Sequence, residues 1–171
     1  MSAIQQLQMR YSPEEDRVLL RINTTGQEEF RFWLTRRYCG LIIQALNAHR
    51  SADPDVSAQS TPVAKKAVEA FKQEAANAEG NFEQAFQEAK TYPLGEHPAL
   101  AQRLKYSIDS GLLALTIEPK EGRGITIKLD AKLNFNVSKL LGAAIATGEW
   151  QLEMDQTALE APQGVVDRVI N

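Results

Sequence analysis

The fold of this chain is decided by residues 10–35, RYSPEEDRVLLRINTTGQEEFRFWLT, because a related stretch begins 95 positions later. Without a gap, residues 18–22 fall on residues 113–117, and residues 30–34 fall on residues 125–129. The apolar positions agree in phase across both strands. The identical pairs are Tyr11/Tyr106, Ser12/Ser107, Leu20/Leu115, Ile22/Ile117 and Leu34/Leu129. We interpret this agreement as an internal duplication.

Each repeat is predicted to form three strands and a helix. In the first repeat, apolar and polar residues alternate over residues 4–11, 17–23 and 29–35, a period typical of half-buried strands. Short turns join these strands, which predicts an antiparallel meander. Thr35 then suits a helix N-cap, and apolar residues at helical spacing predict a helix over residues 36–49.

The segment between the repeats is predicted to be a linker followed by a helical insert. Residues 49–60 are rich in Ser, Ala, Asp and Pro, which indicates an exposed linker. A helix is expected from Thr61, and a second helical segment from Phe82 to Lys90, as two amphipathic helices or as one bent helix. The apolar stripe of the first helix should face the sheets or a partner, and consists of Val63, Ala67, Ala70, Phe71 and Ala75.

The second repeat restarts at Ala101 with a tighter first turn, Asp109-Ser110-Gly111. Four extra residues, 131–134, are expected before its helix. The apolar face of that helix matches the first helix at an offset of 99 and contains Val137, Leu140, Leu141, Ala144 and Ile145. Residues 149–153 suggest a further short strand.

These patterns predict an α+β protein of two β-β-β-α repeats with antiparallel meander sheets and approximate two-fold symmetry. The expected organisation is repeat one over residues 1–50, the linker and insert over 51–100, repeat two over 101–150 and a C-terminal arm over 151–171. Neither repeat can bury its sheet and helix alone, so the two should pack into one domain.

Composition favours a cytoplasmic globular protein. Hydrophobic residues make up 43% of the chain, yet no apolar run is long enough to span a bilayer, and no secretory signal is visible. A lone cysteine, Cys39, excludes an internal disulfide and suits a reducing compartment. The net charge of −3 arises mainly between the repeats, because residues 51–100 carry four Lys/Arg and eight Asp/Glu.

Motifs for catalysis or for cofactor binding are not found, so we expect a binding protein without cofactor or metal. The two histidines are far apart, and the chain has neither a phosphate-binding Gly loop nor a G-x-S-x-G turn. The acidic turn Glu14-Glu15-Asp16 is more consistent with a solvated turn than with a metal site. Cys39 follows Arg36 and Arg37, which could lower its pKa, but a packed thiol is the simpler interpretation.

Strand alternation collects a basic face on one side of the predicted sheets. Arginines interleaved with a tryptophan suit single-stranded nucleic acid, because guanidinium groups contact phosphates and the indole stacks on bases. The residues proposed for this surface are Arg10, Arg17, Arg21, Arg31, Trp33, Lys105 and Lys128. The alternative is a solvated sheet face on which the insert covers Trp33 and pairs with the arginines.

A second hypothesis assigns the protein to a different functional class, a protein-interaction or assembly module. Its exposed amphipathic insert would dock on a partner or on a second copy of the chain through Phe71, Phe82 and Phe86.

The segments 11–21 and 29–37 resemble the opening of a family of uncharacterised bacterial proteins. This resemblance covers residues 1–45 and implies no established activity. The order of duplicated strands followed by a helix is also similar in layout to the Whirly and PUR single-strand-binding folds. Those folds use four strands per unit, whereas three are predicted here.

Overall fold

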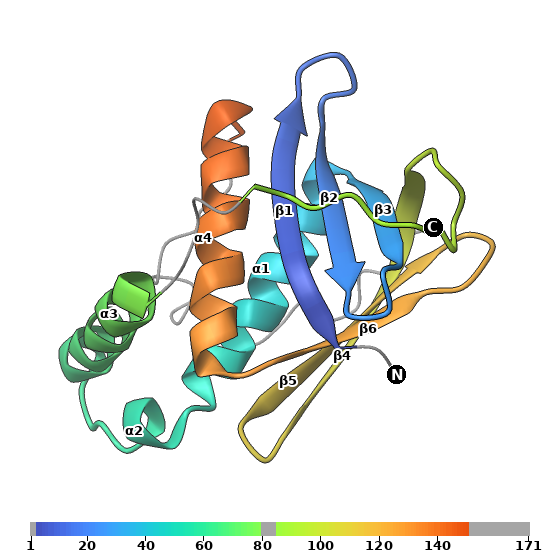
Figure 1. Cartoon of the computed structure of the whole chain (residues 1–171). Helices are drawn as coiled ribbons and strands as arrows, with labels where there is room; N and C mark the ends of the chain where they lie inside the picture. The colour runs from blue at the N-terminus through green and yellow to red at the C-terminus, as the bar shows by residue number, and fades with distance from the viewer. Residues whose placement is uncertain (1–2, 80–84, 151–171) are drawn as a thin grey trace.

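The structure, a computed structural model, describes residues 3–79 and 85–150. One six-stranded sheet and four helices form over these residues (Figure 1). In chain order the elements are β1 (Ile4–Ser12), β2 (Arg17–Thr24), β3 (Glu29–Leu34), α1 (Arg36–Ser51), α2 (Pro54–Ser57), α3 (Pro62–Glu79), β4 (Ala99–Asp109), β5 (Leu112–Pro119), β6 (Ile125–Leu129) and α4 (Ala131–Thr147). The predicted α+β class is confirmed.

The sheet is mixed, so the expectation of purely antiparallel sheets is wrong. Its strands lie in the order β1-β2-β3-β4-β5-β6. Pairing is antiparallel within β1–β3 and within β4–β6, but β3 and β4 run parallel, with Phe32 opposite Ala99 and Trp33 opposite Leu100. The long connection through α1, α2 and α3 returns the chain to the end of the sheet where β3 began, which makes a parallel pair possible.

The second and third strands of the two halves share one register. Val18 lies opposite Leu34 in the β2–β3 pair, and Leu113 lies opposite Leu129 in the β5–β6 pair, 95 residues further on. The first strands also share a register irregularity, which falls after Ile4 in β1 and after Ala101 in β4. The sequence offset between these two positions is 97.

The gapless alignment of Tyr11 with Tyr106 is therefore wrong by two residues. Met9 pairs with Leu20, and Tyr106 pairs with Leu115, so Met9 holds the position equivalent to Tyr106. Turn length explains the shift, because four residues join β1 to β2 whereas only Ser110 and Gly111 join β4 to β5. A shift of two residues preserves the side-chain alternation, so each side chain stays on the same face of the sheet, although Tyr106 and Ile108 of β4 are 50% and 36% exposed there.

The helices that follow the third strand of each half, α1 and α4, start at equivalent positions. The Thr35 hydroxyl accepts a hydrogen bond from the Tyr38 N–H at the start of α1, and the Asp130 carboxylate accepts one from the Leu133 N–H at the start of α4. The prediction of four extra residues before the second helix is wrong, because α4 begins at Ala131 directly after its cap. Asp130 can end the strand and cap the helix at once, since its side chain replaces a missing backbone acceptor.

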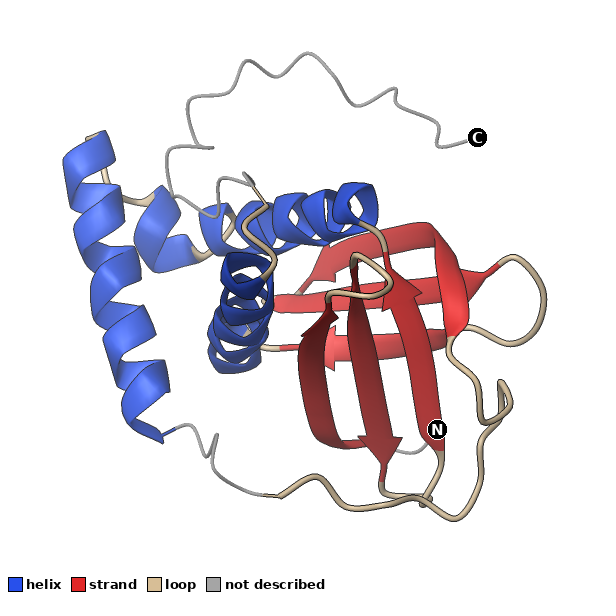
Figure 2. Cartoon of the chain, turned by 90° about the horizontal axis from the view of Figure 1, so that it is seen from above, coloured by secondary structure: helices blue, strands red, loops and turns tan. Residues whose placement is uncertain are grey.

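Helices α1 and α4 contact strands of both halves, and contact those of the other half more extensively. α1 lies against β4 and β5, and α4 lies against β1. The Tyr38 hydroxyl of α1 donates a 2.9 Å hydrogen bond to the Arg103 carbonyl of β4. In Figure 2 the helices gather on one side of the strands. The core beneath them includes Val18, Leu20, Ile22, Phe32, Leu34, Ile42, Leu46, Leu113, Leu115, Ile117, Ile127 and Leu129.

The sheet is open between β1 and β6, its two edges. A two-fold relation would place β6 beside β1 as β4 lies beside β3, but no such pairing joins the described edges. A cavity of about 300 Å³ lies there instead, lined by residues of β1 and α4 together with Phe86 and Leu129.

The segment between the halves differs from its prediction in two places. The expected linker contains α2, in which Val56 is buried at 2% exposure. The helix expected from Phe82 to Lys90 is wrong over its described part, because residues 85–90 form no helix. Their backbone bonds elsewhere: Lys90 N–H donates to the Gln27 carbonyl, and Thr91 forms a bridge with Glu28.

The chain beyond α4 is described only to Trp150. Glu149 adopts a left-handed φ of 54°, in a turn rather than in the short strand expected from residue 149. The rest of that strand and the C-terminal arm lie outside the described residues.

Candidate functional site

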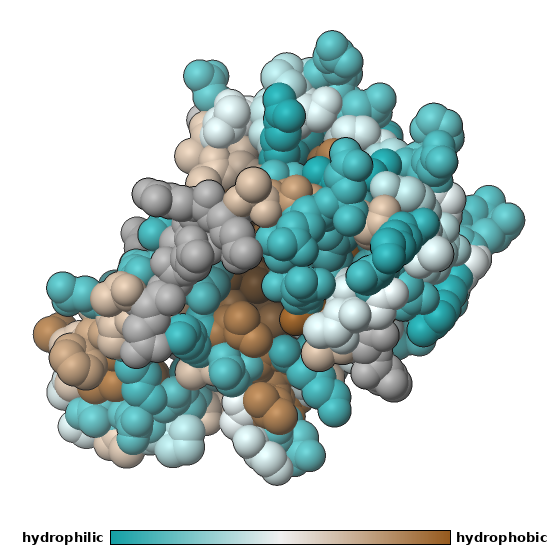
Figure 3. All heavy atoms as spheres, in the orientation of Figure 1, coloured by the Kyte–Doolittle hydropathy of each residue, from teal (hydrophilic) through white to brown (hydrophobic). Residues whose placement is uncertain are grey.

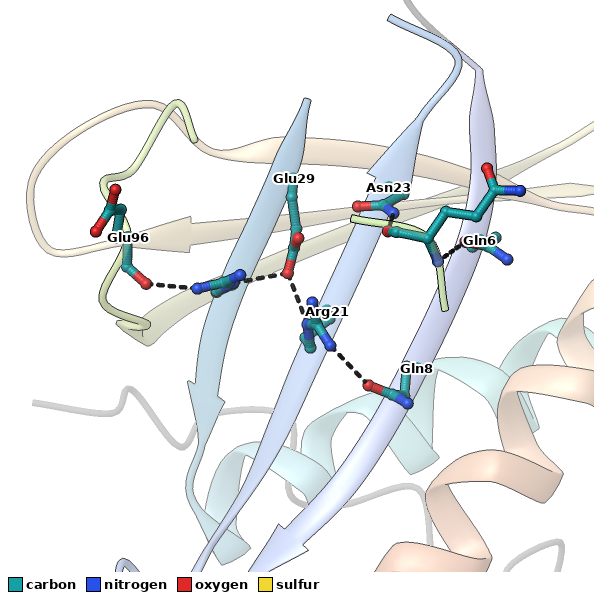
Figure 4. A network of polar contacts seen from close by, with 8 residues as sticks. Gln6, Gln8, Arg21, Asn23, Glu29 and Glu96 are labelled. Carbon is teal, nitrogen blue, oxygen red and sulfur yellow. Dashed lines mark hydrogen bonds and ion pairs between the residues drawn. The ribbon is translucent and has the colours of Figure 1, made fainter. Parts of the chain in front are cut away.

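A buried carboxylate organises the outer face of β2 and β3. Glu29 Oε1 accepts hydrogen bonds from Arg21 Nε at 2.6 Å and from Arg31 Nε at 2.7 Å (Figure 4). The Glu29 side chain is fully buried, whereas those of Arg21 and Arg31 are about a quarter exposed. Strand alternation explains the cluster, because all three residues point to the face opposite the helices.

The arginines keep this carboxylate charged. Burial alone raises the pKa of Glu29, but the hydrogen bonds and charges of Arg21 and Arg31 outweigh it, and the pKa falls below its usual value. Glu29 in turn raises the pKa of Arg31, against a smaller opposing effect of burial. The single charge of Glu29 thus balances one of the two positive charges of Arg21 and Arg31 on this face.

The segment that follows residue 84 is fastened to this face by its backbone. Gln6 Nε2 donates to the Ala85 carbonyl at 3.1 Å, and Gln87 N–H donates to Gln6 Oε1 at 2.8 Å. Asn23 Nδ2 donates to the Gln87 carbonyl. Gln6 and Asn23 thus satisfy backbone groups that would otherwise need a helix or water.

Side chains of the same segment cover both arginines. The Arg21 guanidinium lies 4.1 Å from the centre of the Phe86 ring, and that of Arg31 lies 4.5 Å from the centre of Tyr92. Arg31 Nη1 also donates to the Glu96 carbonyl at 2.8 Å. Aromatic rings stacked on guanidinium groups at these distances are attractive and exclude water. Each of the two arginines therefore places two of its N–H donors and one ring contact within this chain.

Within residues 3–79 and 85–150, the other residues proposed for nucleic acid form no hydrogen bond or ion pair with this cluster. Trp33 is half-buried, and Arg10 and Lys128 are exposed. Arg17 lies 3.6 Å from Glu15, and Lys105 lies 2.8 Å from Glu118. Of the seven residues, the structure brings Arg21 and Arg31 together around a shared partner.

Glu29 is the residue that sequence reasoning missed on this face. It stands two positions before Arg31 on β3 and diagonally across from Arg21 on β2, so all three share one side of the pleat. Opposite charges at such positions attract. That spacing was a readable signal in the sequence.

The apolar stripe of α3 faces away from the rest of the molecule. Val63 and Phe71 are 78% and 75% exposed, and the alanines at positions 67, 70 and 75 are also exposed. The opposite side of α3 carries Glu69 and Ala76, at 3% and 5% exposure. Hydrophobic atoms gather over α3 at the lower left of Figure 3.

Ion pairs contribute to this orientation of α3. Lys72 Nζ lies 2.7 Å from Asp53 Oδ1 and 2.7 Å from Asp55 Oδ2, which ties α3 to the start of α2. Phe86 lies on the sheet face rather than on α3, and Phe82 lies outside the described residues. Of the three phenylalanines proposed for partner binding, Phe71 is the one that the structure leaves open on α3.

The remaining candidate groups have structural partners. Cys39 is fully buried, and burial raises the pKa of its thiol to about 12, which disfavours a thiolate. Asp16 accepts hydrogen bonds from the Tyr11 hydroxyl at 2.7 Å and from Trp150 Nε1 at 2.8 Å. These two bonds lower the pKa of Asp16.

Over residues 3–79 and 85–150, no group of three or more His, Cys, Asp or Glu side chains has a metal-binding arrangement. In the same residues, no helix combines the length and the apolar character needed to cross a membrane. Comparisons with protein-family models, with curated proteins and with solved structures found no match to this chain.

Proposed function

We propose that this protein is an assembly module that self-associates through the apolar face of α3. The observation that supports it is the outward direction of the stripe formed by Val63, Ala67, Ala70, Phe71 and Ala75. An amphipathic helix normally turns its apolar stripe toward the core. Here the polar side of α3 packs on the molecule, and the apolar stripe is exposed and available to contact another protein surface.

A second copy of the chain is the occupant that the stripe fits. Alanine side chains allow two helices to approach closely, and Phe71 could then pack over Ala67 and Ala70 of the other helix. Exposed Lys66 and Glu74 stand four residues before and four residues after Ala70. Two antiparallel helices crossing at Ala70 would bring each Lys66 beside the opposing Glu74, an isologous contact with charge complementarity.

Sedimentation equilibrium over roughly 1 μM to 1 mM, the range of weak and moderate affinities, tests the proposal. We expect wild-type protein to form a dimer and Phe71→Glu to shift it to the monomer. Leu112→Glu is the matched control, because Leu112 is also an exposed large hydrophobic residue, at 42%, but lies on β5. A wild-type monomer throughout this range, or a dimer that Phe71→Glu leaves intact, would contradict self-association.

Charge exchange tests the antiparallel arrangement. Lys66→Glu and Glu74→Lys should each weaken the dimer, because each places like charges together. The double exchange should restore it, since it recreates both pairs with reversed sign. Exposed pairs contribute roughly 0.2–1 kcal/mol each, so the effect should be measured at low salt. Additive weakening in the double variant would argue against a crossing at Ala70.

Binding of single-stranded nucleic acid by the basic face has less support as a function. Its central arginines, Arg21 and Arg31, share the buried Glu29 carboxylate and lie against Phe86 and Tyr92. A strand-binding groove needs cationic groups open to phosphates and rings open to bases.

We also infer that the two halves descend from one duplicated β-β-β-α unit with approximate two-fold symmetry. Three observations support it: the identical β2–β3 and β5–β6 registers, the shared irregularity in the first strands and the caps at Thr35 and Asp130. The reciprocal packing of α1 on β4 and β5 and of α4 on β1 is a fourth. The two-fold symmetry is broken at the open edge, because, in the described part of the chain, β6 does not pair with β1 as β4 pairs with β3.

A further inference from the structure

A cavity of about 120 Å³ lies where α1, α2, α3, the β4–β5 turn and the start of α4 meet. Its walls are largely apolar, with Val56, Ile108 and Phe135 among them. Four charged side chains also line it: Arg50, Asp53, Glu69 and Lys72. Of these, Arg50 and Glu69 come from different helices of the described chain and form no ion pair with each other, which distinguishes the cavity from a packing void.

Arg50 brings a buried positive charge that no carboxylate neutralises directly. Its Nη1 donates to Asn134 Oδ1 at 3.1 Å and to Ser138 Oγ at 2.7 Å, and its Nη2 donates to Asn47 Oδ1. These acceptors are all neutral. Burial lowers the pKa of Arg50, with Glu69 as a weaker opposing influence.

The Arg50 guanidinium retains unused donors. A guanidinium carries five N–H groups, and three are bonded here. Those left are one on Nε and one on Nη2, and a carboxylate is the acceptor that a guanidinium binds most strongly.

Glu69 brings a buried carboxylate without a hydrogen-bond donor in the described residues. The residue is 3% exposed and lines the cavity. No ion pair within 4.0 Å joins it to Arg50 among these residues, although the two charges interact across the cavity. Burial raises the pKa of Glu69, more than Arg50 lowers it.

The other polar groups of the wall are already satisfied. His49 Nε2 lies 3.0 Å from the Gly111 carbonyl, and His49 Nδ1 lies 2.9 Å from Asn134 Nδ2. The amide nitrogen of Asn134 can only donate, and it also donates to the Leu46 carbonyl, so His49 Nδ1 accepts its second hydrogen bond. The Gly111 carbonyl can only accept, so His49 Nε2–H donates to it. Lys72 is held by Asp53 and Asp55. The unsatisfied groups are thus one cationic fork and one carboxylate.

We propose that this cavity binds a small amino acid, whose carboxylate pairs with the unused donors of Arg50 and whose ammonium pairs with Glu69. Such a ligand supplies each buried charge with the opposite charge, which a purely anionic or purely cationic molecule cannot do. The cavity volume limits the ligand to a few carbon atoms between its two charged groups, and the apolar walls accommodate those carbons. This site is independent of the self-association of α3, because Glu69 lies on the opposite side of that helix from Phe71.

Thermal unfolding and calorimetric titration of the full chain at neutral pH test the site with a series of probes. The probes are glycine, β-alanine and γ-aminobutyrate, which differ in the distance between the charged groups. Propionate and propylammonium are the controls with one charge each. We expect at least one amino acid to bind saturably and to raise Tm, with an affinity tenfold or more above that of either control.

Variants separate a ligand site from a structural ion pair. Glu69→Gln and Arg50→Lys should each weaken the best probe tenfold or more, because one removes the carboxylate and the other removes the fork. Glu121→Gln, an equal charge change at an exposed residue between β5 and β6, should bind as wild type does. Absence of binding by every amino acid, equal binding of propionate, or unchanged affinity in Glu69→Gln would overturn the proposal.

Discussion

Thr35 and Asp130 stand 95 residues apart and perform the same task, since each follows a third strand and accepts a hydrogen bond from the N–H three residues later. Their distances are 3.2 Å and 2.8 Å. Replacing an N-cap by alanine costs about 0.5–2 kcal/mol. We expect Thr35→Ala and Asp130→Ala each to lower the free energy of unfolding by this amount, measured by urea denaturation. Thr35→Ser and Asp130→Asn, which keep an acceptor, should restore most of it. Wild-type stability in either alanine variant would show that its cap is not used.

Neighbouring leucines of β2 should respond very differently to truncation. Leu20 is 1% exposed beneath the helices, as is its counterpart Leu115, whereas Leu19 points to the outer face and is half-buried. Leu20→Ala and Leu115→Ala should each cost roughly 2–5 kcal/mol, and Leu19→Ala less than half of that. Thermal and urea unfolding of the three variants would measure this, and equal losses at positions 19 and 20 would contradict the assigned facing.

Glu29 should make stability depend on pH in the acidic range. Its pKa is lower in the folded protein than its ordinary value of 4.5, because the bonds from Arg21 and Arg31 outweigh burial. Its stabilising contribution is therefore complete above pH 4.5 and is lost as the pH falls through the folded pKa. Glu29→Gln should be less stable than wild type at pH 7, and the difference should shrink below pH 4.5. A difference that stays constant down to pH 3 would exclude this ionisation as the cause.

Removal of one arginine should reveal the structural role of the basic cluster. Arg21→Ala leaves Glu29 with one partner and exposes the Phe86 ring, so a loss of about 1–3 kcal/mol is expected. Lys128→Ala, an exposed cation on β6, should stay within about 0.5 kcal/mol of wild type. Urea denaturation gives both values. If Arg21→Ala leaves stability unchanged but abolishes salt-dependent binding of a short single-stranded oligonucleotide, the basic face is a binding surface after all.

Gly124 should not tolerate a side chain. A Cβ added there would lie 2.6 Å from the Ile117 carbonyl oxygen, a backbone atom fixed by the sheet. Gly124→Ala should cost about 1–3 kcal/mol, as overpacking does. Gly40→Ala is the control, because a Cβ there meets nothing within 4 Å and alanine favours a helix. We expect that variant to unfold at an equal or higher temperature than wild type.

The sequence by itself determined the six strands and the start of α1. Alternation of Val18, Leu20 and Ile22 predicts a buried row, and all three are at most 1% exposed. Thr35 likewise predicts the start of α1. Both predictions succeed because strand alternation and helix capping depend on residues that are close in sequence.

Only the tertiary structure decided how these elements meet. The two-residue shift at Met9 and Tyr106 follows from turn length, which leaves the period-two pattern unchanged. Residues 85–90 have a helical pattern, yet the amides of Gln6 and Asn23, remote in the sequence, bind their backbone instead. Local propensity contributes a few tenths of a kcal/mol per residue, less than several such contacts together.

Which side of α3 packs on the molecule could not be predicted from the sequence, because this also depends on residues that are distant in the chain. Its apolar stripe is readable, but Lys72, Asp53 and the buried Glu69 decide that the polar side packs inward. Arg50 and Glu69 come from two helices and meet only across a cavity that the fold creates. A stripe or a charge is a property of the local sequence, whereas its partner is set by which distant surfaces the chain brings together.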